Sequence, residues 1–264
     1  MKSIHITILL IAFVQTFIIT KVNAQDIEIA GKLIVHDIKT DTSNIDSVKL
    51  LTTIDGVAHQ SAANDIVFNY FKNLPKGAKL LVDAGMNVQD LLDQGMTPMD
   101  IYQSGISASD IYGKTYAGGL IFFIDTLDVF PIQGMVASPN DLMNATYGCQ
   151  DVDLGLRGAA IGLGAANTWI HQATCAEVNS AANVCGNLVE GGFGDWFLPS
   201  YNELLAMYNN LHSLGYGSFQ NLFYTSSSEI NESLQHVHDF GNSGGIGAHT
   251  KGAPAFLVRA ARVF

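Results

Sequence analysis

The sequence predicts an α+β protein in which a β-rich segment and a short run of helices precede a larger mixed domain. Three observations support this prediction: short segments of alternating apolar residues, a ten-residue repeat with helix signals, and a C-terminal half that holds most of the 26 glycines. Strands and helices separated by long glycine-rich loops are typical of α+β domains. A chain of 264 residues is long enough for one large hydrophobic core or two smaller ones.

Residues 1–24 have the features of a secretory signal peptide. The segment starts with basic Lys2, continues as an apolar run from Ile4 to Ile19 that polar residues interrupt, and ends in the small-residue exit Val22-Asn23-Ala24. It is too short and too polar to span a membrane, which takes about 20 apolar residues, and no later segment approaches that length. We therefore expect cleavage near Ala24 and a secreted or cell-surface protein without a membrane span.

The charge of the chain excludes one class of function. Cleavage removes Lys2 and Lys21, which leaves 11 basic and 24 acidic side chains and a net charge of −13. Binding to nucleic acid needs clustered basic residues that neutralise phosphates, so no nucleic-acid partner is expected. No motif in the chain calls for a cofactor.

Residues 25–75 are interpreted as a small β-rich base. Alternating apolar residues predict strands near 27–29, 32–36 and 47–51, and Asp55-Gly56 predicts a turn. A piece of this size has little apolar surface of its own. We expect it to pair with copies of itself or to pack against the following residues.

Residues 76–113 contain a ten-residue repeat that predicts short helices. Pro98 fits a first helical position, and glycine recurs where a helix would end. Such short helices need neighbours to be stable, so we expect them to stack as a neck. A spacer is favoured over a binding ledge, because no aromatic or charged cluster recurs. The predicted helix starts and stops are Asn87, Thr97 and Ser107, and Gly85, Gly95 and Gly105.

Residues 114–264 form the predicted head domain. One helix is expected over about 167–189, and a second begins at Ser200, which forms a capping box with Glu203. The Gly162-x-Gly164-x-x-Asn167 stretch is interpreted as a tight start to the first helix and not as a phosphate loop, since the third glycine is missing. Strands are predicted at 120–124, 134–137 and 256–264.

The head resembles the bacterial Lcl C-terminal domain family, which has been known as a domain of unknown function. The resemblance covers about residues 114–264, and its motifs occur in the order of the family. They are Tyr116-Ala117-Gly118-Gly119-Leu120-Ile121-Phe122-Phe123-Ile124-Asp125, Gly148-Cys149, Ile161-Gly162-Leu163-Gly164-Ala165-Ala166-Asn167-Thr168, Asp195-Trp196-Phe197-Leu198-Pro199-Ser200 with Glu203-Leu204, Ser226-Ser227-Ser228-Glu229, and Val258-Arg259-Ala260-Ala261-Arg262.

This resemblance implies a C-type-lectin-like head, similar to the group that includes the sulfatase-modifying enzymes. It implies that Trp196, Pro199 and Ser200 have structural roles, with Trp196 in the core. One family member is a surface adhesin that binds sulfated glycans, but the acidic charge of this chain argues against sulfated ligands. Family members usually carry Tyr-Trp before the triple serine, whereas this chain has Tyr224-Thr225.

Residues 26–75 resemble tail-fibre-like shaft segments, which implies a homotrimer.

The cysteines argue against an enzyme. The enzymes of the group act through a late cysteine pair, and no cysteine follows Cys185 here. Cys149 and Cys175 flank a glycine-rich loop and are expected to form a disulfide that leaves Cys185 buried, although spacing alone leaves the pairing open. No Ser/His/Asp or paired-carboxylate pattern stands out.

Two sets of charged or metal-ligating residues have alternative interpretations. His236 and His238 share one face of a strand and would bind a metal if Glu229, Asp239 or His249 supplied a third ligand, but ordinary surface histidines are favoured.

Arg259 and Arg262 lie three apart on the predicted closing strand, so they should face opposite ways. We expect Arg259 to be buried against a carboxylate, with Glu229 favoured over Glu203.

The function favoured by the sequence is adhesion or recognition of an extracellular ligand such as a glycan. The loops of residues 225–252 are expected to bind it, because amides, carboxylates and aromatic rings recognise sugars. The candidate contacts are Tyr224, Glu229, Asn231 and Asn242. Two alternatives remain: a purely structural cap of a fibre, and a metal-dependent enzyme that uses His236 and His238.

Overall fold

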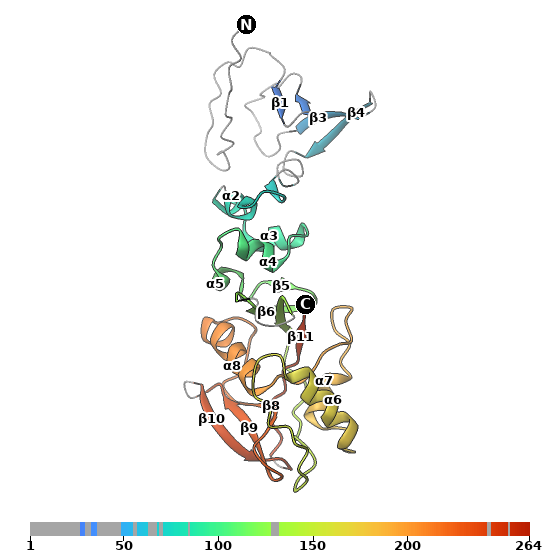
Figure 1. Cartoon of the computed structure of the whole chain (residues 1–264), viewed down its shortest axis with the longest axis vertical. Helices are drawn as coiled ribbons and strands as arrows, with labels where there is room; N and C mark the ends of the chain where they lie inside the picture. The colour runs from blue at the N-terminus through green and yellow to red at the C-terminus, as the bar shows by residue number, and fades with distance from the viewer. Residues whose placement is uncertain are drawn as a thin grey trace. The chain divides into compact units, whose positions relative to one another are not determined.

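The computed structural model divides the chain into two compact units, shown in Figure 1. One unit comprises Met1–Asn87 with Gln103–Gly105, and the other comprises Val88–Tyr102 with Ile106–Phe264. The second unit thus begins earlier than the predicted head boundary at Lys114. The predicted signal peptide, residues 1–24, lies outside the described residues. The structure describes residues 27–29, 33–35, 49–54, 57–62, 68, 71–83, 85–127, 132–241, 244–252 and 254–264.

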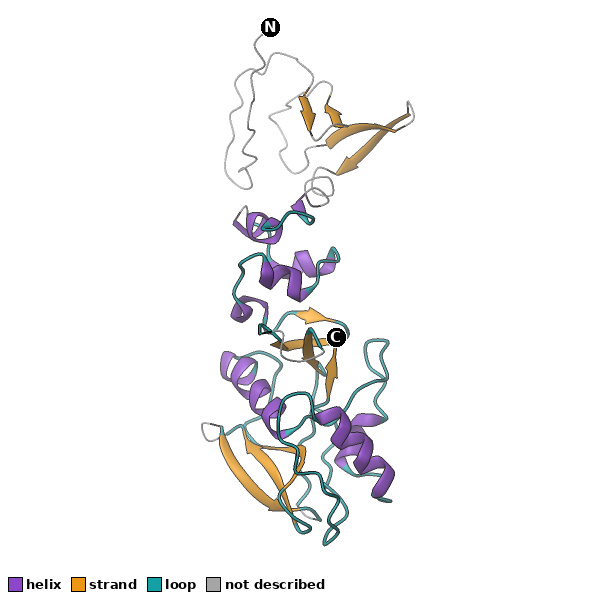
Figure 2. Ribbon diagram, in the orientation of Figure 1, coloured by secondary structure: helices purple, strands orange, loops and turns teal. Residues whose placement is uncertain are grey.

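Among its described residues, the first unit contains antiparallel strand pairs and helix α2 (Figure 2). Ile54 is opposite Val57 in the second pair, and the predicted turn at Asp55-Gly56 lies outside the described residues. The expected β-rich character of this part is therefore observed. The elements are β1 (Ile27–Ile29) with β2 (Leu33–Val35), β3 (Lys49–Ile54) with β4 (Val57–Ala62), and helix α2 (Gly77–Asp83).

The ten-residue repeat forms short helices: α2 and then α3 (Val88–Asp93), α4 (Pro98–Gln103) and α5 (Ala108–Ile111). Each predicted stop residue has a left-handed backbone, with φ of 101° at Gly85, 94° at Gly95 and 102° at Gly105. Side chains other than glycine avoid this region, so the three glycines end the helices.

The predicted starts of α4 and α5 also form. The Asp100 N–H donates to the Thr97 hydroxyl at 3.1 Å, and the Thr97 N–H donates back to the Asp100 carboxylate at 3.2 Å. Ser107 accepts from the Ser109 N–H at 3.4 Å. These bonds use backbone donors that a short helix leaves unpaired.

Helix α3 is hydrogen-bonded to the first strand of the head. The Gln89 side chain accepts from the Thr115 N–H at 2.8 Å and donates to the Thr115 carbonyl at 3.0 Å. Thr115 belongs to an edge strand, whose outer backbone groups would otherwise be unpaired. The Gln89 side-chain amide thereby pairs with the outer backbone groups of Thr115, as a neighbouring strand would.

The first sheet of the head has four antiparallel strands in the order β11-β7-β6-β5. Its central strands β6 (Gly119–Ile124) and β7 (Gly134–Ala137) match the apolar segments predicted from the sequence. The other two strands are β5 (Thr115–Tyr116) and β11 (Ala261–Val263).

The prediction of one continuous closing strand over 256–264 is wrong. The regular strand β11 holds three residues, and Phe256 and Leu257 instead form isolated bridges to Ala145 and Tyr224. The closing segment therefore pairs first with Ala145 and Tyr224 and then, as β11, with β7. The alternation of apolar residues within the segment does not show this change of partners.

The second sheet has the order β10-β9-β8 and is antiparallel. His238 lies opposite both Tyr224 and Ile246, and Gln235 lies opposite His249. Residues that are directly opposite share one face of a sheet. The strands are β8 (Phe223–Glu229), β9 (Leu234–Asp239) and β10 (Gly245–Thr250).

The predicted single helix over 167–189 is wrong, because two helices replace it: α6 (Gly164–Thr174) and α7 (Ala181–Gly186). The first ends at Cys175, whose backbone is extended, and the second starts at Ser180, which accepts from the Asn183 N–H. The end of α6 at Cys175 and the helix cap at Ser180 thus divide a segment whose apolar pattern predicts one continuous helix.

Helix α8 (Tyr201–Asn210) joins the two sheets, because it contacts β6 in one sheet and β8 and β9 in the other. The predicted capping box of Ser200 and Glu203 is present at its start. A short 3₁₀ turn, η1 (His212–Leu214), follows. Buried apolar residues from α8 and both sheets form one core, including Phe122, Met135, Leu204, Met207, Tyr224 and Phe240.

The observed head is thus an α+β domain, as the sequence predicts. Within the described residues, every helix is too short or too polar to cross a bilayer.

Candidate functional site

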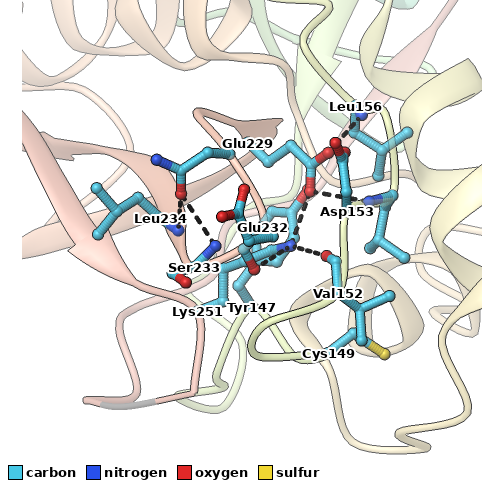
Figure 3. Close-up of polar contacts among 12 residues, drawn as sticks. Tyr147, Cys149, Val152, Asp153, Leu156, Glu229, Glu232, Ser233, Leu234 and Lys251 are labelled. Atoms are coloured by element: carbon cyan, nitrogen blue, oxygen red, sulfur yellow. Dashed lines mark hydrogen bonds and ion pairs between the residues drawn. The ribbon is translucent and has the colours of Figure 1, made fainter.

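A buried ion pair lies among the loops where the sequence predicts a ligand site (Figure 3). The Lys251 ammonium donates to Glu229 Oε2 at 2.8 Å, and neither side chain has solvent exposure. The other two Lys251 donors reach the carbonyls of Val152 at 2.6 Å and Glu232 at 3.1 Å. All three N–H groups of the ammonium are therefore used.

The Glu229 carboxylate is also fully engaged. Its Oε1 accepts from the Leu156 N–H at 2.9 Å and from Arg157, and the Leu154 N–H approaches Oε2 at 3.4 Å. Arg157 in turn pairs with Asp153 at 2.9 Å. The hydrogen bonds from Arg157, followed by that from the Gly155 N–H, lower the pKa of the Asp153 carboxyl to about 2.

This network fixes loops that have no regular secondary structure. It joins residues 152–157 to the end of β8 and to Lys251, which follows β10. Close by, the disulfide between Cys149 and Cys175 links the same loop to the end of α6. Cys185 is free and buried, and burial raises the pKa of its thiol. The arrangement stabilises the loops, and the charges of Lys251, Glu229 and Arg157 are paired with one another.

The structure places the predicted ligand contacts in different surroundings. Tyr224 is completely buried and Glu229 is 1% exposed, so neither reaches a ligand at the surface. The Asn231 side chain accepts from the N–H groups of Ser233 and Leu234, both at 2.9 Å, and so shapes the turn between β8 and β9. Asn242 lies outside the described residues. For Tyr224 and Glu229 the prediction is wrong, because polar and aromatic strand residues give the same sequence pattern whether they face the solvent or the core.

Tyr224 belongs to a second buried network. Its hydroxyl donates to Asp141 Oδ2 at 2.8 Å, and Arg259 Nε donates to Asp141 Oδ1 at 2.8 Å. Burial, with a contribution from Asp141, strongly raises the pKa of the Tyr224 phenol. The expected pairing of Arg259 with Glu229 is wrong, since Glu229 pairs with Lys251 and Arg157.

The two arginines of the closing segment lie in different surroundings. The Arg259 side chain has no exposure, whereas the Arg262 side chain is 12% exposed, pairs with Asp195, and lies with its guanidinium 3.6 Å from the Phe193 ring centroid. Arg262 is therefore more covered than a solvated surface arginine.

The segment around Trp196 has a structural role. Trp196 is 2% exposed and donates from its indole nitrogen to the carbonyl of Phe193 at 3.2 Å. Pro199 supplies a carbonyl that accepts from the Ser227 N–H at 2.8 Å, which links the segment to β8.

The start of α6 is not a phosphate site, because Glu203 already occupies its donors. The Glu203 carboxylate accepts from the N–H groups of Gly162 at 2.8 Å and Gly164 at 3.3 Å. A Cβ at Gly164 would lie 2.2 Å from a Glu203 oxygen, so only glycine fits there. Burial raises the pKa of the Glu203 carboxyl, and these N–H groups oppose the rise.

His236 and His238 lie in β9 and both face helix α8. The ring centroid of Tyr201 is 5.1 Å from His236 and 5.8 Å from His238. None of the three expected third ligands joins them. Glu229 is in its ion pair, His249 shares a face with Gln235, and Asp239 is the next residue along β9, so it points to the other face. Burial lowers the pKa of both imidazoles, which favours their neutral forms.

The outer face of α6 carries an exposed tryptophan that the sequence analysis did not identify as a site. Trp169 is 69% exposed, and its neighbours one turn away on the helix include the exposed residues Ala165, Ala166 and Ala173. We call these four residues the Trp169 face. From Gly158 to Val189, Glu177 is the single residue that carries a charge. This nearly uncharged stretch is the feature of the sequence that could have indicated the Trp169 face.

An open hollow of about 340 Å³ lies where α3 meets the turn between β5 and β6. Its charged lining residue, Asp93, accepts from the Gln89 side chain at 2.8 Å. Tyr224, Glu229 and Asn231, the predicted ligand residues that the structure describes, do not line it. The lining residues are Leu92, Asp93, Thr115, Tyr116, Ala117, Gly118, Gly119 and Pro139.

Comparisons with known proteins give little similarity. No protein-family model matches the chain, and no curated protein matches it in sequence. Among solved structures, a fimbrial protein from Bacteroides ovatus ATCC 8483 is similar with a TM-score of 0.40 and 11% sequence identity. The similarity covers 55% of this chain and 44% of that protein. A similarity this weak establishes neither family nor function.

Proposed function

We propose that the chain is an exported, non-enzymatic recognition protein whose head binds an uncharged extracellular glycan through the Trp169 face. The observation that carries this proposal is the 69% exposure of Trp169 on a helix face of small residues. The resemblance of the head to a family with an adhesin, and the signal peptide expected at residues 1–24, support the same interpretation.

The Trp169 face combines one large exposed ring with small neighbouring side chains. A large aromatic ring between alanines stands clear of its neighbours, so a sugar ring can lie flat against it. Burying such a ring removes apolar area from water without displacing a charged group. Trp is also the side chain that most often contributes strongly to binding when it becomes covered.

Charge restricts the class of glycan. The nearest acidic residue in the sequence, Glu177, is engaged with the Cys149 N–H at 2.7 Å, and the 158–189 stretch has no Lys or Arg. Sulfated or phosphorylated ligands need basic groups, which this surface lacks. Neutral sugars, which bind by stacking and by hydrogen bonds to amides, fit better.

A glycan array with the labelled mature protein tests the proposal. We expect binding to uncharged glycans, little change when the salt concentration rises, and loss of binding in Trp169→Ala. Met143→Ala is a matched control, because Met143 is also an exposed apolar residue, 62% exposed, and lies outside the Trp169 face. Binding confined to sulfated glycans would contradict the proposal, as would equal binding by Trp169→Ala. Failure to bind any glycan, together with a Trp169-dependent change in assembly, would favour the structural cap.

A further inference from the structure

Three polar side chains meet between strand β9 and helix α8. His236 and His238 are two residues apart on one strand, so their imidazoles project on the same side. Tyr201, in the first turn of α8, lies against both rings, with centroid distances of 5.1 Å and 5.8 Å. We call these three residues the His–Tyr cluster.

The polar atoms of this cluster lack partners. His238 has no solvent exposure, and neither of its ring nitrogens has a hydrogen-bond partner among the described residues. The same holds for the Tyr201 hydroxyl and for Nδ1 of His236. More than nine in ten buried polar groups in folded proteins are paired with protein or with ordered water, so four atoms without a protein partner on three adjoining side chains are an unusual concentration of atoms that could bind an ion.

The surroundings restrict the chemistry of that partner. Aromatic rings border the cluster, with Tyr208 5.1 Å and Phe240 5.5 Å from His238. The atoms of the cluster that could bind a ligand are imidazole nitrogens and a phenol oxygen. Imidazole prefers zinc, copper and nickel, whereas magnesium and calcium prefer several carboxylate or carbonyl oxygens.

We propose that His236 and His238 bind one transition-metal ion of the zinc and copper class, with the Tyr201 hydroxyl as a neighbouring oxygen ligand. Two histidines separated by one residue on a strand supply two ligands from a rigid element, and α8 supplies the third. His236 is only partly buried, which gives the ion a route from solvent. This site is independent of the Trp169 face and of any glycan.

The third ligands expected from the sequence are Glu229, Asp239 and His249, whereas the residue that lies against both imidazoles is Tyr201. The residue is 35 positions before His236 and enters the cluster because the capping box at Ser200 starts α8 immediately before it. Carboxylates are absent from the proposed ligand set, so hard cations are expected to be rejected.

Calorimetric titration of the untagged, chelator-treated mature protein tests the proposal. Zn²⁺ and Cu²⁺ are the probes, and Mg²⁺ is the negative control ion. We expect one Zn²⁺ or Cu²⁺ per chain and no measurable Mg²⁺ binding. His236→Gln should weaken binding about 100-fold or more, since it removes a direct ligand, and Tyr201→Phe about tenfold, since it removes the oxygen and keeps the ring.

His249→Gln is the matched control. His249 lies in the same sheet but on the other face, against Phe223 and Phe256, so its loss should leave metal affinity unchanged. His236 is partly exposed, which keeps the His236→Gln variant foldable even if His238 variants are not. Absence of one-to-one binding, or equal affinity in wild type and His236→Gln, would overturn the proposal. The unpaired atoms would then be assigned to buried water.

Discussion

Arg259 and Asp141 form a buried ion pair across 118 positions of sequence. The guanidinium Nη2 lies 2.7 Å from Asp141 Oδ1, and Arg259 also donates to the carbonyls of Ser138, Pro139 and Gly217, each at 2.8 Å. The contact closes the head, because it joins the segment before β11 to the long loop that follows β7.

Arg259→Ala should therefore unfold the head much more readily than Arg262→Ala. Removing Arg259 leaves the Asp141 carboxylate mostly buried without its cation, which costs about 3–5 kcal/mol. Arg262 pairs with Asp195, which is 62% exposed, and stacks on Phe193, so its loss should cost about 1 kcal/mol. Urea melts of the two variants measure both values, and equal effects would contradict the assignment.

Lys251→Met should also destabilise the chain by about 3 kcal/mol, because the buried Glu229 carboxylate would lose its buried cation and keep only Arg157, whose side chain is 46% exposed. The double variant Lys251→Met with Glu229→Gln should recover part of the loss, since the buried carboxylate that has lost Lys251 is then absent. Lys79→Met is the control, because its pair with Asp83 is exposed on α2. A double variant no more stable than Lys251→Met would show that the ion pair itself is not the cause.

Loss of the disulfide in Cys149→Ser with Cys175→Ser should lower stability by about 3 kcal/mol, given the sequence separation of 26 residues. Cys185 should remain unreactive toward a thiol reagent in the native protein, because it is buried and its thiol pKa is raised. Thermal melts and reagent labelling check these two expectations. Peptide mapping that joins Cys185 to either partner would contradict them.

Stability should fall as the pH decreases below about 6.5, and His171 should contribute to the slope. Burial, opposed by the Tyr147 carbonyl and reinforced by Lys251, lowers the His171 pKa below its usual 6.5. The unfolded chain then binds more protons than the folded chain, so acid favours unfolding.

His171→Gln should flatten this pH dependence without abolishing it. The amide can still donate to the Tyr147 carbonyl, which Nε2 of His171 contacts at 2.9 Å. Urea melts between pH 7.5 and about pH 5 measure the slope for each protein. A slope unchanged by the substitution would exclude His171 as a contributor.

Local features of the head and neck were predictable from sequence because their partners lie three or four residues away. The capping box of Ser200 and Glu203 and the cap of Thr97 by Asp100 are such cases. The left-handed glycines of the repeat belong to the same group. The positions of β6 and β7 followed from apolar patterning, since a central strand is buried on both sides.

The candidate site was not predictable in the same way. Tyr224 reads as an exposed aromatic in a polar strand, and only its contact with Asp141 places it in the core. Trp169 lies in an apolar helix segment whose sequence does not say which side chains face solvent, and only the position of α6 in the head leaves it 69% exposed.

The sequence by itself determined the order of the parts, the helix starts and stops, and the α+β class, because hydrogen bonds within one turn depend on neighbouring residues alone. The tertiary structure decided which carboxylate pairs with Arg259, which lysine neutralises Glu229, and that Tyr201 joins His236 and His238. Those contacts join residues that are 118, 22 and 35 or more positions apart. Their formation depends on the path of irregular loops, which residue periodicity does not encode.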